Sequence, residues 1–122
     1  MSVPTTEQRR EWTSLADRIS IALTGYDLTI EVLDPDGGDA SMVERRPFHG
    51  LTYDVRDDVL VISVGKGDAS HAVVLRHLIQ SPREIASDVI PQGAALRIAD
   101  ASGTTTVVTL LRPPERGSDV PG

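Results

Sequence analysis

The 122-residue sequence contains no cysteine, and this absence excludes several classes of site. Disulfides, thiol catalysis and cysteine-ligated zinc or iron–sulfur centres all require that residue. Aromatic residues are also scarce, since the sequence has one tryptophan, two tyrosines and one phenylalanine. Four rings cannot form the stacking platform on which single-stranded nucleic acids are bound. The core must therefore be built mainly from aliphatic side chains.

The sequence has fewer basic than acidic residues, and it has no long apolar run. Twelve lysines and arginines stand against eighteen acidic residues, which gives a net charge of −6. This balance repels phosphate backbones and anionic membranes, so we expect neither nucleic acid nor membrane as a partner. No apolar run approaches the roughly 20 residues of a membrane helix, and the polar first residues do not resemble a secretory signal. We expect a cytoplasmic protein.

The length is that of one ordinary domain. We expect a single globular domain over residues 1–112 and a disordered tail over residues 113–122, where proline and glycine are frequent. Near the start, Thr5 and Gln8 have the spacing of a capping box. Apolar residues follow at helical spacing: Trp12, Leu15, Ala16, Ile19 and Leu23. This pattern predicts an amphipathic helix over residues 6–23 that ends before Gly25.

The remainder of the chain has the patterns of strands. Alternating or apolar segments joined by short turns predict strands at residues 26–33, 40–46, 51–56, 59–64, 71–79 and 83–90 and a hairpin at 94–111. Pro47 should interrupt the second strand, and residues 83–90 also permit a helix. Because all connections are short, the strands should be mainly antiparallel neighbours.

Two hairpins have a predictable register. A two-residue turn at Asp57 and Asp58 would pair Val55 with Leu60, Tyr53 with Ile62 and Leu51 with Val64. A three-residue loop ending on Gly103 would pair Ile98 with Thr106, Leu96 with Val108 and Ala94 with Leu110. We predict an α+β fold, in which the N-terminal amphipathic helix packs on a bent, mainly antiparallel sheet of about seven or eight short strands. A small barrel and a two-layer sandwich are the alternatives.

The sequence contains no recognisable catalytic or metal site. Residues 34–39 resemble a calcium loop, but the twelfth position, which needs an acidic ligand, is Arg45. His71 and His77 are six residues apart on one expected strand and cannot chelate one ion together. Asp57 and Asp58 are adjacent, so their carboxylates diverge instead of converging for acid–base work. We therefore predict no catalytic residue, no cofactor and no metal.

The densest polar cluster is the best candidate for a binding site. Arg45, Arg46 and His49 lie on an expected edge strand, close to the apolar residues Met42 and Phe48. Such a combination is typical of a protein-binding patch, although charges that guard an edge against aggregation explain it equally well. The first functional hypothesis is a non-catalytic binding or regulatory module that acts through protein contacts. A small-molecule binder with a pocket at the sheet or barrel mouth, and an unrecognised enzyme using a histidine with an aspartate, are the alternatives.

Five segments carry a resemblance to a known family, namely residues 10–12 (REW), 28–38 (LTIEVLDPDGG), 47–55 (PFHGLTYDV), 81–84 (SPRE) and 95–112 (ALRIADASGTTTVVTLLR). Over these segments the chain resembles a small uncharacterised family of actinobacterial and related bacterial proteins, known only as a domain of unknown function. The resemblance implies a bacterial single-domain protein. It brings no activity and no catalytic residue with it.

Overall fold

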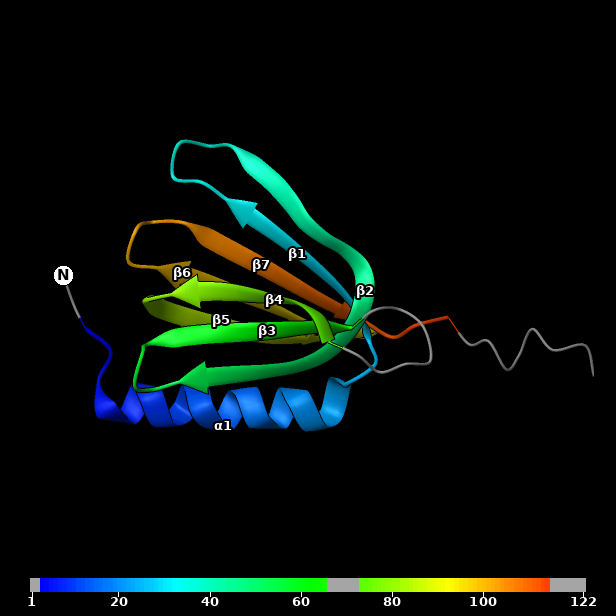
Figure 1. The fold of residues 1–122 in the computed structure, drawn as a ribbon, viewed down its shortest axis with the longest axis horizontal. Helices are drawn as coiled ribbons and strands as arrows, with labels where there is room; N and C mark the ends of the chain where they lie inside the picture. Colours follow the sequence, from blue (N-terminus) through cyan, green and yellow to red (C-terminus); the bar gives the residue numbers. More distant parts are fainter. Residues whose placement is uncertain (1–2, 66–72, 115–122) are drawn as a thin grey trace, which may run out of the picture.

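The computed structural model describes residues 3–65 and 73–114. One helix and seven strands follow one another along the chain (Figure 1): α1 (Thr6–Leu23), β1 (Asp27–Leu33), β2 (Asp39–Asp54), β3 (Val59–Gly65), β4 (Val73–Gln80), β5 (Pro82–Ile90), β6 (Gly93–Asp100) and β7 (Thr105–Leu111). This confirms the predicted α+β class. Within the described ranges, no helix is both long and apolar enough to span a membrane.

Helix α1 begins and ends where the sequence predicts. The Thr5 hydroxyl accepts a hydrogen bond from the Gln8 amide at 3.0 Å, and the Gln8 side chain accepts one from the Thr5 amide at 2.9 Å. These two bonds satisfy two backbone donors that the first turn of a helix leaves unpaired. Gly25 follows the helix with a φ of +94°, a conformation that glycine adopts at little cost.

The seven strands form one sheet in the order β4-β3-β2-β1-β7-β6-β5, and every described pair is antiparallel. The sheet is strongly bent but does not close into a barrel, since β4 and β5 remain its two edges. Ser81 is the single residue between β4 and β5 in the sequence. Its amide donates to the Asp58 carbonyl at 2.8 Å, and its carbonyl accepts from the Ala101 amide at 3.0 Å. One residue thus ties the β4–β5 corner to two neighbouring turns.

Strand β2 is longer than the sequence suggests, because Pro47 does not interrupt it. The strand pairs with β1 over residues 39–47 and with β3 over residues 48–54. Pro47 stands where β2 changes partner, a position at which the missing backbone N–H of proline is tolerated. The register of β2 against its partners shifts around Met42, around Glu44–Arg45 and around His49. Bulges of this kind bend a strand, and β2 accordingly turns back on itself at one end of the sheet (Figure 1).

The β2–β3 hairpin differs from its predicted register by two residues. Tyr53 pairs with Leu60 and Leu51 with Ile62, so Val55 lies in the turn, where 46% of its surface is exposed. The turn is longer because the Asp54 carboxylate accepts from the amides of Arg56 and Asp57 at 3.0 and 3.2 Å. A shift of two residues keeps the same face inward, so the residues predicted for the core are still buried, apart from Val55.

The second hairpin confirms all three predicted pairs, Ile98 with Thr106, Leu96 with Val108 and Ala94 with Leu110. Gly103 has the expected positive φ of +90° in its loop. The aliphatic core lies between the two arms of the bent sheet and includes the buried face of α1, with Trp12 as its largest helix residue. Trp12 contacts Tyr53 edge to face, with ring centroids 5.3 Å apart.

Helix α1 lies along the second part of β2 and covers an edge that β1 does not reach (Figure 1). The Ser20 hydroxyl accepts from the Leu51 amide at 2.8 Å and donates to the Leu51 carbonyl at 2.9 Å. Nearer the bend, Phe48 exchanges backbone hydrogen bonds with Gly25 and Tyr26, each at 2.8 Å. This edge of β2 is therefore satisfied by the helix and its C-terminal connection.

Candidate binding groove between β2 and β4

A groove lies between the first part of β2 and strand β4. Over residues 39–46, β2 pairs with β1 on one side, and no described strand pairs with its other side. Strand β4 likewise pairs with β3 alone. Because β2 bends, these two unpaired edges line opposite sides of one groove. An unpaired strand edge presents a row of backbone donors and acceptors, which natural proteins normally protect.

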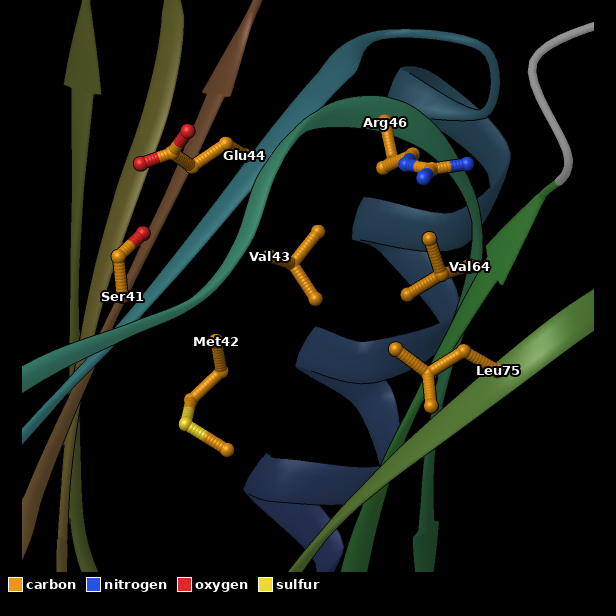
Figure 2. Close-up of a pocket in the computed structure, with 7 residues that line it drawn as sticks. All are labelled: Ser41, Met42, Val43, Glu44, Arg46, Val64 and Leu75. Carbon is orange, nitrogen blue, oxygen red and sulfur yellow. The ribbon is translucent and has the colours of Figure 1, made fainter.

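The part of the groove next to the bend of β2 has an apolar floor. Figure 2 shows Val43 and Met42 of β2 opposite Val64 of β3 and Leu75 of β4, with Arg46 at the rim. This part has a volume of about 600 Å³ and is lined by Ser41, Met42, Val43, Glu44, Arg46, Val64 and Leu75. Val43 and Val64 are buried, whereas Met42 and Leu75 expose 53% and 44% of their surface. The groove therefore combines a fixed apolar floor with accessible apolar walls.

The groove continues from Met42 toward the Ser81 corner. This second part has a volume of about 700 Å³, and its lining comes from β4, from β2, from the facing ends of β1, β6 and β7, and from the β1–β2 and β6–β7 turns. The lining includes Asp34, Met42, His77, Leu78 and Asp100. We call the two parts together the β2–β4 groove. Leu78 is 53% exposed, so three large apolar side chains along this groove are open to solvent.

His77 lies on β4 directly opposite Ile62, which is fully buried, and is itself half-buried. Burial lowers the pKa of its imidazole below the ordinary value of 6.5. At neutral pH the ring is therefore mainly uncharged and adds no positive charge to the groove. No aspartate or glutamate is hydrogen-bonded to His77 among the described residues, so the structure gives it no orienting carboxylate for general-base catalysis. His71 lies outside the described residues.

The structure separates the three residues that the sequence groups as a binding patch. Arg46 lines the groove. Arg45, in a left-handed conformation with a φ of +50°, instead forms an ion pair of 3.5 Å with Asp27 of β1 and lies away from the groove. His49 is half-buried at the third bulge of β2. Phe48 is only 2% exposed and belongs to the core, so Met42 is the apolar neighbour that remains available.

The sequence pattern did not predict that Leu75 and Leu78 lie at the surface. Strand β4 reads as a nearly continuous apolar run, and such a run normally indicates a strand buried on both faces. The interrupting Arg76 and His77 were the one available signal that β4 lies at an edge. The bend of β2, which creates the groove, depends on bulges that no pattern of apolar residues reveals.

A second polar cluster lies at the β2–β3 turn. The Tyr53 hydroxyl donates to one oxygen of Asp58 at 2.7 Å, and Arg83 donates to the other at 3.0 Å. Burial raises the pKa of Asp58, but the hydrogen bonds from Tyr53 and Arg83 and the charges of Arg83 and Arg9 outweigh it and lower the pKa below 3.8. Burial and the bond to Asp58 raise the pKa of Tyr53 to about 12. Both shifts move the pKa of the group away from neutrality, so this cluster fits a structural tie better than acid–base catalysis.

The described residues also contain no group of three or more histidine, aspartate or glutamate side chains arranged to hold a metal ion. Asp34, Asp36 and Asp39, the acidic residues of the calcium-like segment, are spread over the β1–β2 connection and the start of β2. These three aspartates therefore do not form such a group.

Comparison with known proteins adds ancestry but no activity. A family model described as "Family of unknown function (DUF5335)" matches residues 5–120. An uncharacterized protein of Aquifex aeolicus (strain VF5) is 29% identical over 103 residues, which cover 84% of this chain and 86% of that protein. No solved structure matches the chain. Any functional assignment must therefore come from the surface of the molecule itself.

Proposed function

The chain belongs to DUF5335, a family of unknown function, as its sequence resemblance predicted, and we propose that it is a binding module that accepts an extended segment of a partner protein in the β2–β4 groove. The observation that carries this proposal is the pair of unpaired strand edges that line the two sides of a groove with an apolar floor. Addition of a strand to an exposed edge is a common mode of peptide recognition. Main-chain hydrogen bonds supply affinity and side-chain pockets supply specificity.

The opposite edge of the sheet is a poorer candidate. Strand β5 also pairs on one side alone, but the concavity beside it is lined by charged residues of α1, including Glu7, Arg10 and Glu11. Charges beside an edge discourage the pairing of another strand. The groove beside β4 instead presents Met42, Leu75 and Leu78. This contrast favours β4 as the edge that is kept open for a partner.

The test uses a displayed library of random seven-residue peptides, selected on the full chain. We expect enriched peptides that alternate apolar and polar residues, because alternate side chains of a strand face the groove. Met42→Gln and Leu75→Gln remove apolar contacts without adding charge. Each should weaken a selected peptide about tenfold, since burying such a side chain contributes about 1.5 kcal/mol or more.

Val89→Gln is the matched control, because Val89 is 93% exposed on β5 and lies outside the groove. It should leave the affinity unchanged. Selection of no peptide, or of peptides whose affinity is the same in wild type, Met42→Gln and Leu75→Gln, would contradict the proposed function. A cytoplasmic location and a regulatory role belong to the same proposal.

A small-molecule ligand is the second candidate function. Each part of the groove, at about 600 and 700 Å³, has the size of an ordinary ligand pocket. Native mass spectrometry of the purified chain distinguishes the two candidates. A bound compound that is lost in Met42→Gln would favour the small molecule. Detection of the wild-type chain alone, with no added mass, would favour the peptide.

A further inference from the structure

We infer that the partner segment carries a lysine or arginine where it reaches the Ser81 end of the β2–β4 groove. This inference rests on the proposed function and concerns the chemistry of the partner. At this end the β1–β2 and β6–β7 turns lie together, since a Cβ on Gly103 would be 3.4 Å from the Pro35 side chain. Asp34 and Asp100, one from each turn region, line the groove beside the end of β4.

Both carboxylates can still accept a cation. Asp34 makes no hydrogen bond through its carboxylate and no ion pair among the described residues. For Asp100, one oxygen accepts from the Ser102 amide, the Ser102 hydroxyl and the Thr104 amide at 2.9, 2.6 and 3.1 Å. Its second oxygen takes no part in this network. These bonds hold the carboxylate in a fixed position, so a partner cation does not have to order it.

The charge of the groove is uneven along its length. Near the bend of β2, Glu44 and Arg46 offset one another. Near Ser81, no described lysine or arginine lines the groove, and His77 is mainly uncharged at neutral pH because burial lowers its pKa. Asp34 and Asp100 therefore leave the Ser81 end of the groove negatively charged. A segment with a basic residue at that position complements this end, and the net charge of −6 steers a basic partner toward the protein.

The peptide library of the preceding test also answers this question. We expect lysine or arginine to be enriched at one end of the selected peptides and the affinity of the tightest peptide to fall as salt rises. Asp34→Asn and Asp100→Asn should each weaken that peptide about two- to fivefold, as expected for partly exposed ion pairs. Asparagine retains the oxygen that accepts from Ser102 and Thr104, so the turn is preserved. Asp88→Asn, on exposed β5, is the matched control and should have no effect.

The outcomes separate the two claims. Peptides that depend on Met42 and Leu75 but show no basic preference, or bind Asp34→Asn and Asp100→Asn as tightly as wild type, would overturn this inference and leave the proposed function standing. Peptides that ignore Met42 and Leu75 would overturn both. A homodimer in analytical ultracentrifugation that Leu75→Gln dissociates would also overturn the inference, because a second copy would then occupy the groove. So would a chain ending at Pro114 that binds the peptide more than tenfold tighter, because residues 115–122 would then be the occupant.

Discussion

Gly93 is the residue whose identity the backbone fixes most strictly. A Cβ at this position would lie 1.9 Å from the carbonyl oxygen of Leu110 on the neighbouring strand β7. Gly93→Ala should therefore force β6 and β7 apart and lower the free energy of unfolding by about 2 kcal/mol or more. Chemical denaturation measures this change. Gly38→Ala is the control with little expected effect, because the nearest atom to its Cβ is 3.7 Å away. Equal midpoints for the two variants would contradict the described β6–β7 pairing.

Tyr53 gives the fold a predictable dependence on alkaline pH. Its pKa is raised to about 12 in the folded protein, against 10.0 ordinarily, so the folded state holds the phenolic proton more tightly than the unfolded chain. The resulting stabilisation is fully present below pH 10 and is lost as the pH rises from 10 to about 12. Spectrophotometric titration should show a phenolate that forms near pH 12 and is absent in Tyr53→Phe. If Tyr53→Phe instead removes a phenol that titrates near pH 10, the hydrogen bond to Asp58 does not hold the Tyr53 hydroxyl in the folded protein.

Helix α1 completes an edge of strand β2 that no described strand covers. Ser20→Ala removes the hydroxyl that both donates to and accepts from the backbone of Leu51. Since two partly buried backbone groups lose their partner, the free energy of unfolding should fall by about 1–3 kcal/mol. Thermal and urea denaturation measure the loss. Ser14→Ala, an exposed position on the same helix, should change stability by less than about 0.5 kcal/mol. A neutral Ser20→Ala would show that the helix does not close this edge.

Local chemistry explains which elements could be predicted from the sequence. The capping box of α1 and the loop ending on Gly103 depend on neighbours a few residues away, so their boundaries and register followed from spacing. The β2–β3 turn did not, because side-chain bonds from Asp54 and the left-handed Asp58 lengthen it. The prediction that Pro47 interrupts β2 was also wrong. Only the tertiary fold shows that β2 exchanges one partner strand for another there.

The candidate site is formed by segments far apart in the sequence and was only partly predictable. The sequence grouped Arg45, Arg46 and His49 with Met42 and Phe48 as one patch. Arg46 and Met42 line the groove, whereas Arg45 pairs with Asp27 and Phe48 is buried. His49 is half-buried at the last bulge of β2. The other wall comes from β4, about thirty residues further along the chain. Which two edges face each other depends on the bend of β2, and the bend depends on bulges near Met42, Arg45 and His49.

Isotope-edited NMR on the chain bound to its tightest selected peptide shows whether a partner strand occupies the β2–β4 groove. The proposed function predicts an extended peptide with backbone contacts to β4 and side-chain contacts to Met42 and Leu75. The basic residue of the peptide should lie near Asp34. A peptide in contact with β5 around Val89, or one that binds as a helix, would contradict the proposed function.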